Sequence, residues 1–131
     1  MSSLKEVMPG AIEFKAVESG SEVLYYKAYG QNNSFMGVVF KASGKGYSSV
    51  VETIVGMLKD GTITAIKVLS QNETPGLGAR VTEPSFTGQF KQINISGLDS
   101  VSAVTGATIS SRAVINSVML KAKEIQGQIQ E

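Results

Sequence analysis

The sequence predicts a single α+β domain, built from a mostly antiparallel sheet with flanking helices at the two ends of the chain. Two observations predict this class. Five runs rich in β-branched and aromatic residues follow one another, separated by short turns of Gly, Asn, Asp or Ser. The segment near the C-terminus instead repeats its apolar residues at the spacing of an amphipathic helix. With 131 residues, 42% of them apolar, we expect one domain over residues 1–131 with a modest core.

The first half of the chain predicts one short helix and five strands. Residues 2–8 are expected to form the helix, which Pro9-Gly10 ends. The strands are expected at residues 12–17, 22–29, 35–42, 50–58 and 62–70. Asp60-Gly61 is a strong signal for a tight hairpin between the last two, so these are expected to be antiparallel neighbours. Gly56 inside a strand indicates a bulge or a close approach of another backbone, and residues 43–47 indicate a flexible hairpin loop.

The stretch after the strands predicts a second short helix. It covers residues 83–92, begins near Pro84, and would carry Phe86 and Phe90 inward, because these two residues lie one helical turn apart. Residues 94–103 are then expected to be irregular or to form a short strand.

The main helix is expected from Ser110 onward, with Ser110 or Ser111 as its N-cap. The polar residues 126–131 are expected to fray. The buried stripe of the helix is expected to consist of Val114, Ile115, Val118, Met119, Ala122 and Ile125.

The composition excludes several classes of function. The chain has no Cys and no His, which rules out thiolate-bound iron–sulfur clusters, His-ligated haem, ordinary zinc sites and Ser-His nucleophiles. A redox role would therefore need an organic cofactor. The formal net charge is only +1 and no basic stripe is present, so nucleic acid is not expected as a partner. There is also no apolar run long enough to span a membrane, and no signal-peptide pattern.

The first candidate site is the run of small and hydroxyl residues that opens into the main helix, Val104-Thr105-Gly106-Ala107-Thr108-Ile109-Ser110-Ser111. The start of a helix offers free N–H groups and a partial positive charge, so an anion held at Thr108 would be stabilised without a basic side chain. Gly106 lets the backbone come close to a ligand, and Ala107 keeps the approach narrow. On this pattern alone, the alternative is ordinary turn and cap chemistry.

The second candidate site is the loop Glu73-Thr74-Pro75-Gly76-Leu77-Gly78. Pro-Gly fits the central positions of a type II turn, which leaves Leu77 at the tip between two glycines. Two interpretations remain open. Leu77 packs into the core below an ordinary surface turn, or it forms an exposed apolar tip on which a planar ring can rest, with free amides beside it.

Both motifs resemble, in the same order, those of a known family. Thr105-Gly106-Ala107-Thr108 is similar to the Ser/Thr-Gly-Ala-Thr signature at which FMN is joined through its phosphate to threonine. The run from Glu73 to Gly78 recurs in the same proteins. They are the FMN-binding subunits of two membrane complexes: the G subunit of the Rnf electron-transport complex and the C subunit of the sodium-translocating NADH:quinone oxidoreductase. The likeness covers most of residues 1–126 and is closer to the Rnf protein.

The resemblance implies an FMN-binding domain of the Rnf G and Nqr C type, in which the last Thr of the signature, Thr108, carries the flavin. Ser102 stands where the family usually has Asp, three residues before the signature. No metal and no catalytic side chain are implied, because the redox chemistry is that of the cofactor. The residues implied to bind FMN are Thr108, Thr105, Gly106, Ala107, Ser110, Glu73, Thr74, Pro75, Gly76, Leu77, Gly78 and Tyr47.

The resemblance also implies a role and partners. The chain would carry electrons among other subunits of an ion-translocating complex, without a reaction of its own, and a separate flavin transferase would attach FMN using FAD. Residues 1–10 resemble the stretch that follows a single N-terminal membrane anchor in this family, so the anchor would be missing from this chain. A naturally soluble version is the alternative. The domain would lie on the extracytoplasmic face of the cell membrane.

Two other functions remain open at this point. The chain could bind FMN without a covalent bond, as a module of another flavoprotein in which the Thr108 hydroxyl stays free. It could instead be a cofactor-free scaffold that docks other subunits through its sheet edges.

Overall fold

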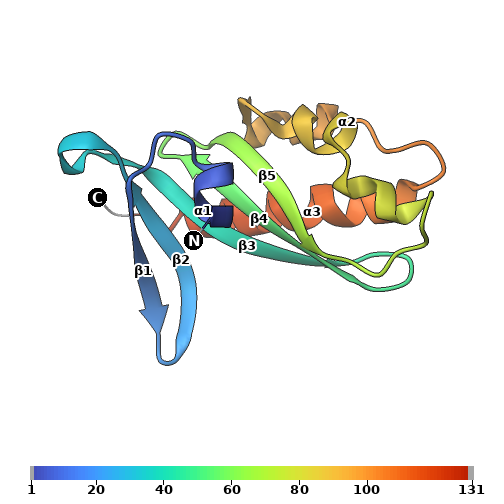
Figure 1. The fold of residues 1–131 in the computed structure, drawn as a ribbon, viewed down its shortest axis with the longest axis horizontal. Coiled ribbons are helices and arrows are strands. Elements are labelled where there is room, and N and C mark those ends of the chain that lie inside the picture. The colour runs from blue at the N-terminus through green and yellow to red at the C-terminus, as the bar shows by residue number, and fades with distance from the viewer. Residues whose placement is uncertain (1, 130–131) are drawn as a thin grey trace.

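The computed structural model describes residues 2–129 and confirms the α+β class. Six antiparallel strands form one sheet in sequential order, with helices on both of its faces (Figure 1). The helices and strands are α1 (Ser2–Val7), β1 (Glu13–Ser19), β2 (Glu22–Tyr29), β3 (Phe35–Lys45), β4 (Val50–Leu58), β5 (Thr62–Ser70), α2 (Pro84–Thr87), β6 (Ile93–Asn94) and α3 (Thr108–Gln126). Short 3₁₀ helices cover Gln31–Asn33, Gly78–Thr82, Gly88–Phe90 and Ile95–Ser100.

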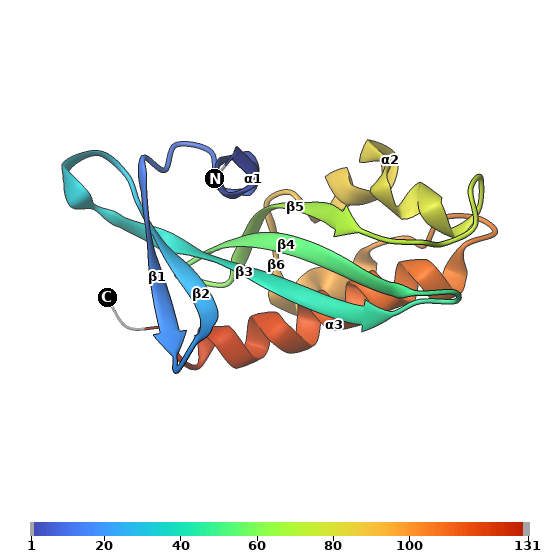
Figure 2. The same cartoon turned by 60° about the horizontal axis from the view of Figure 1, so that its bottom comes forward.

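The sheet separates two apolar cores. Figure 2 shows α1 on one face and α3 running along the other. The smaller core lies under α1 and contains Leu4, Val7, Met8, Ala11, Ala28, Val39, Ile54 and Ala65. The larger core lies under α3 and α2, and includes Phe40, Val55, Phe86, Phe90, Val114, Ile115, Val118, Ala122 and Ile125. The apolar stripe predicted for the main helix therefore faces the sheet, because burying it removes the most apolar surface from water.

Local features expected from the sequence are present in the hairpins. Gly61 has a positive φ of 91°, and its N–H donates to Leu58 O, so Asp60-Gly61 makes the tight turn between β4 and β5. The pairing of these strands shifts register at Gly56, where any side chain would collide with the carbonyl oxygen of Val7. Gly56 is thus both a bulge and a point at which α1 lies close to the sheet.

The short helix predicted at residues 83–92 is also present, as α2 followed by a 3₁₀ turn. The rings of Phe86 and Phe90 are buried and meet edge to face with centroids 5.4 Å apart. The connection that follows combines the two-residue strand β6 with a 3₁₀ helix, as expected for an irregular segment.

Three boundaries predicted from the sequence are wrong. β3 continues through Ser43 and Gly44 to Lys45, because these residues pair with β4, and the loop that was expected at 43–47 begins only at Gly46. β1 is displaced toward the C-terminus and ends at Ser19. The chain does not fray at residue 126: Gln128 N–H donates to Ile125 O, and Ile129 packs against the larger core. Residues 130 and 131 lie outside the described residues.

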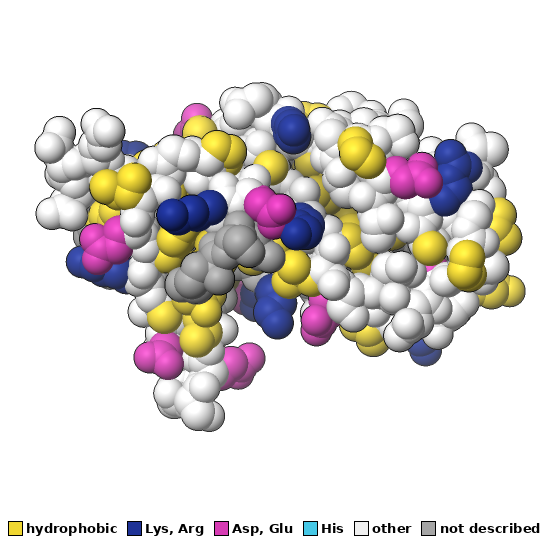
Figure 3. All heavy atoms as spheres, viewed as in Figure 1, with side chains coloured by type: hydrophobic (Ala, Val, Ile, Leu, Met, Phe, Trp, Pro, Cys, Tyr) yellow, Lys and Arg dark blue, Asp and Glu magenta, His cyan; other side chains and the backbone are white. Residues whose placement is uncertain are grey.

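The surface mixes charges of both signs. On the face drawn in Figure 3, Lys and Arg side chains are interspersed with Asp and Glu, so that face offers no continuous basic surface. Within residues 2–129, no helix combines the length and the apolar character that crossing a bilayer requires.

Candidate functional site

The two motifs singled out in the sequence meet at one end of the sheet. The loops after β3, β5 and the last 3₁₀ helix converge there on the N-terminal end of α3, at the right of Figures 1 and 2. They enclose a pocket of about 470 Å³ lined by Tyr47, Ser48, Glu73, Thr74, Leu77, Gly78, Gly106, Ala107, Thr108, Ile109 and Ser110. Of the predicted site residues, Thr105, Pro75 and Gly76 lie in the same loops but do not line this pocket.

The loop before α2 forms the predicted type II turn. Leu77 N–H donates to Thr74 O at 3.0 Å, and Gly76 has the positive φ of 78° that the third position of this turn requires. The side chain of Leu77 is 49% exposed, so the interpretation that places it in the core is wrong. Its Cδ2 lies 3.6 Å from the position that a side chain on Gly106 would occupy. Leu77 therefore forms one wall of the pocket, opposite the bare backbone of the second motif.

The helix start differs from the expected one. α3 begins at Thr108, with Ala107 in the N-cap position and no side-chain cap, so the prediction that Ser110 or Ser111 caps the helix is wrong. Both serines lie inside the first turn, and the first intrahelical bond runs from Ser111 N–H to Ala107 O at 2.9 Å. Within the described residues, the N–H groups of Thr108, Ile109 and Ser110 find no acceptor. These three donors are thus available to an anionic ligand.

The Glu73 carboxylate explains why the serines do not cap the helix. Ser110 Oγ donates to Glu73 Oε1 at 2.6 Å, a charge-assisted bond that draws this hydroxyl away from the helix start. Ser111 Oγ instead donates to Ala107 O at 2.8 Å and accepts from Val104 N–H at 2.9 Å. It therefore fixes the bend by which the second motif enters α3.

Glu73 joins the parts of the pocket to one another. Its side chain is only 5% exposed, and besides Ser110 it accepts from Tyr47 N–H at 2.7 Å, Ser48 N–H at 2.9 Å and Ser49 Oγ at 2.9 Å. Burial raises the pKa of this carboxyl, but the bonds from Ser110, Ser49, Ser48 and Tyr47 outweigh burial and hold the pKa below its ordinary value of 4.5. The group is therefore a buried anion with its acceptor capacity already used.

The four hydroxyl residues of the second motif differ sharply in access. Ser110 is 2% exposed and Ser111 is fully buried, and both are engaged in the bonds described above. Thr105 and Thr108 are exposed, and neither side chain makes a hydrogen bond within residues 2–129. Of these two, only Thr108 lines the pocket. The geometry thus leaves Thr108 as the accessible hydroxyl beside the free N–H groups.

Sequence reasoning missed part of this site. Glu73 was included as a member of its motif, but its role as an acceptor for two other segments, the loop at residues 47–49 and the start of α3, was not foreseen. Ser48, Ser49 and Ile109 were not singled out. The partners of Glu73 lie 24 to 37 positions away along the chain, so no local pattern reports the contacts.

The chain is similar to known proteins in both sequence and fold. A family model described as "FMN-binding domain" matches residues 46–121, which include both motifs. The G subunit of the ion-translocating oxidoreductase complex of Methanosarcina acetivorans is 35% identical, over 88% of this chain and 69% of its own. The G subunit of the proton-translocating ferredoxin:NAD(+) oxidoreductase complex of Clostridium ljungdahlii is 37% identical, over 67% of this chain and 52% of its own.

Among solved structures, the fold is similar to that of the C subunit of the Na(+)-translocating NADH-quinone reductase from Parabacteroides distasonis. The TM-score is 0.69 at 19% identity, over 99% of this chain and 83% of the other. At this identity the likeness concerns the fold, and it agrees with the six-stranded sheet described above.

Proposed function

The chain belongs to the FMN-binding domain family, and from this premise we propose that it carries electrons as the FMN-binding subunit of an ion-translocating oxidoreductase complex of the Rnf type. The observation that carries the proposal is the meeting of both family motifs around one pocket, 470 Å³ in volume, at the uncapped start of α3. A cofactor of this kind needs an anion site for its phosphate and an apolar surface for its ring.

The residues present fit both needs. The three free N–H groups at the start of α3 and the partial positive charge of that end suit a phosphate. Leu77 offers an exposed apolar surface across the pocket. A side chain at Gly78 would collide with Ser110 Oγ and Glu73 Cβ, at 2.5 and 2.7 Å, so this glycine lets both groups pack against its backbone at the pocket. When bound, FMN supplies the redox chemistry, and the protein supplies position and electrostatics.

We propose further that FMN is joined through its phosphate to the Oγ of Thr108. Accessibility favours this hydroxyl over Ser110 and Ser111, and its place in the pocket favours it over Thr105. A phosphodiester at this position keeps one negative charge beside the free N–H groups, which stabilises the product. The bond also prevents loss of the flavin by dilution between turnovers.

Attachment needs an outside catalyst, and we propose a flavin transferase as the maturation partner. The described chain offers no free base at Thr108, since it has no His and the Glu73 carboxylate in the pocket already accepts four hydrogen bonds. The transferase would break the pyrophosphate of FAD, join the FMN phosphorus to Thr108 Oγ and release AMP.

The chain spans 69% and 52% of the two relatives, so the assembly is also a proposal. We propose that the mature protein associates with the other subunits of its complex at a membrane. An N-terminal anchor would hold the domain on the extracytoplasmic face.

Mass spectrometry of protein made together with a flavin transferase tests the attachment. Trypsin should release all four hydroxyl candidates on one peptide, residues 92–112, because no Lys or Arg lies between Lys91 and Arg112. The FMN mass should be found on Thr108, and it should survive denaturation. Protein made without the transferase should fold and remain colourless or only weakly loaded.

Thr108→Val is the matched variant, since it keeps the β-branched shape and removes only the hydroxyl. It should abolish covalent flavin, whereas Thr105→Val should leave loading complete. Flavin that leaves on denaturation of the unaltered protein would favour the non-covalent module. Protein that takes up no flavin under any condition would favour the cofactor-free scaffold.

A further inference from the structure

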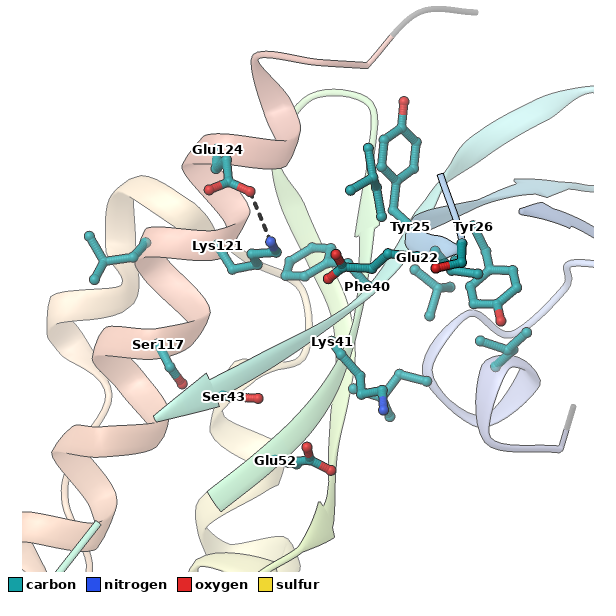
Figure 4. A pocket seen from close by; sticks show the side chains of 17 residues that line it. Glu22, Tyr25, Tyr26, Phe40, Lys41, Ser43, Glu52, Ser117, Lys121 and Glu124 are labelled. Atoms are coloured by element: carbon teal, nitrogen blue, oxygen red, sulfur yellow. Dashed lines mark hydrogen bonds and ion pairs between the residues drawn. The ribbon is translucent and has the colours of Figure 1, made fainter. Parts of the chain in front are cut away.

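The protein has a second surface cleft, which is larger than the candidate flavin pocket and separate from it. Figure 4 shows this cleft, with a volume of about 920 Å³, between β2, the edge of β3 and the C-terminal half of α3. It shares no lining residue with the candidate flavin site. Whatever occupies it can therefore be present whether or not FMN is bound.

The cleft exists because β2 and β3 diverge. β2 pairs with β3 only as far as Tyr26 opposite Val39, whereas β3 continues to pair with β4 as far as Lys45. The β1–β2 hairpin projects away from the sheet beyond this point (Figure 1). Residues 40–45 of β3 thus have a neighbouring strand on one side only, and every second N–H and C=O along them faces the open edge.

This edge has the properties of a template for another strand. The pairing of β3 with β4 runs from Gly37 to Lys45 without a register shift, and residues 40–45 contain no Pro. Proteins usually protect such an edge with a bulge, with Pro, with charged side chains or by covering it. Of these, the segment carries charges, Lys41 and Lys45, which disfavour a basic strand and favour an acidic one. The edge is recessed between two walls, one from β2 and one from α3, and the cleft is lined by Phe40, Lys41 and Ser43 of the unpaired segment.

We propose that this cleft receives an extended segment of a partner polypeptide, which adds to the free edge of β3 as a further strand and alternates apolar with acidic side chains. The length of the free edge, six residues at about 3.3 Å each, is sufficient for one ordinary strand of roughly 20 Å. Backbone hydrogen bonds would provide affinity, and the two walls would provide specificity.

The side chains on the two faces of β3 define the pattern of the partner. Toward α3 the cleft is lined by Phe40, which is 2% exposed, and by Tyr25, while Leu120 on α3 is 71% exposed at its rim. Phe40 and Tyr25 are already covered by the core, so an apolar side chain of the added strand would lie against Leu120. The opposite face of β3 carries Lys41 and Lys45, both exposed, so an acidic side chain is favoured there.

The other charges of the cleft do not satisfy Lys41. Lys121 already pairs with Glu124 at 2.8 Å, and within residues 2–129 Lys41 makes no ion pair. Glu22 and Glu52 also line the cleft but lie beyond ion-pair distance of Lys41, toward which a partner carboxylate would be directed.

A second copy of the chain is a poorer occupant than a different polypeptide. Antiparallel pairing of two β3 edges about Ser43 would place Lys41 of each copy opposite Lys45 of the other, on the same face of the joined sheet. Like charges directly opposite one another destabilise a strand pair. Charge therefore favours a partner that is acidic where this chain is basic.

Selection from a phage-displayed library of random linear peptides, panned on the full chain, tests the proposal. Enriched peptides should alternate apolar and acidic residues, and Lys41→Glu should weaken their binding by about fivefold or more. Lys91→Glu is the matched control, since Lys91 is also exposed but lies outside the cleft, and it should leave the affinity unchanged. Leu120→Lys should weaken binding through the apolar wall.

Amide hydrogen exchange of the complex distinguishes strand addition from side-chain contact. Bound peptide should slow exchange at every second amide of residues 40–45, since only those N–H groups face the edge. Uniform or absent protection there would overturn the proposal, as would a library that yields no binders or binders insensitive to Lys41→Glu. Concentration-dependent protection of the same amides in the chain alone would show that the occupant is a second copy.

Discussion

Replacing Glu73 by Gln changes one atom of the pocket and tests whether the buried carboxylate holds its loops together. The carboxylate accepts from two hydroxyls and from the backbone N–H groups of Tyr47 and Ser48. A hydroxyl can rotate and accept from the new NH₂ group, but a backbone N–H cannot. Whichever oxygen is replaced, one backbone donor loses its acceptor: Tyr47 N–H at Oε1 or Ser48 N–H at Oε2.

The expected cost follows from that one bond. A hydrogen bond to a charged group contributes about 1.5–3 kcal/mol, so we expect the free energy of unfolding to fall by about 2 kcal/mol at neutral pH. For a domain of this size the melting temperature should fall by roughly 8 °C. Glu83→Gln is the matched control, because Glu83 is exposed and its 3.4 Å pair with Arg80 contributes little.

The pH dependence of stability shows whether the charge of Glu73, and not only the shape of its side chain, stabilises the fold. The pKa of Glu73 is lower in the folded chain than its ordinary value of 4.5, so its contribution is fully present above that value. It is lost as the pH falls through the lower, folded pKa. Since Gln does not titrate, the difference in unfolding free energy between the two proteins should be constant near neutrality and shrink in acid.

Urea unfolding followed by circular dichroism at a series of pH values measures this difference directly. A Glu73→Gln protein as stable as the unaltered chain at pH 7 would refute the reasoning. So would a difference that stays the same between pH 7 and values below 4.5, because the carboxylate would then contribute nothing through its charge.

Three further predictions concern the site and its support. Leu77→Asp should alter the flavin absorbance spectrum while leaving the melting temperature almost unchanged, and a large fall in melting temperature with an unchanged spectrum would show that Leu77 stabilises the fold and does not contact the ring. Ser102→Asp should raise the flavinylated fraction measured by intact mass, unless loading is already complete, in which case the acid is not needed. Gly44→Ala should destabilise the fold by about 1–3 kcal/mol, because the new methyl would lie 2.6 Å from Ala113 O on α3. Gly88→Ala, where nothing lies within 4 Å, should stay within about 0.5 kcal/mol in the same thermal melt.

Those features of the fold that depend on neighbouring residues could be predicted from the sequence. The approximate positions of the first five strands, the Asp60-Gly61 hairpin and the buried stripe of α3 all follow from local periodicity and turn chemistry. The end of β3 was misjudged because Ser43 and Gly44 are poor strand formers, and pairing with β4 overrides their propensity. The two motifs of the site could also be identified from the sequence, because a turn and the start of a helix depend on residues that are close together in the chain.

The part that could not be predicted depends on long-range contacts. Ser110 has the composition of an N-cap, and only the buried carboxylate of Glu73, 37 positions earlier, explains why it does not act as one. The point at which β2 diverges from β3 could not be predicted either. Both strands have ordinary strand patterns, and the divergence depends on where their pairing stops.

The position of α3 after the sheet in the sequence determines when the pocket can form. During synthesis the sheet strands emerge first and can pair in order as successive hairpins, whereas their larger apolar face stays uncovered until α3 leaves the ribosome. Thr108, the free N–H groups beside it and the Ser110 that binds Glu73 all arrive with that helix. A ligand or enzyme that recognises the assembled pocket would therefore act only on chains in which α3 has packed against the sheet.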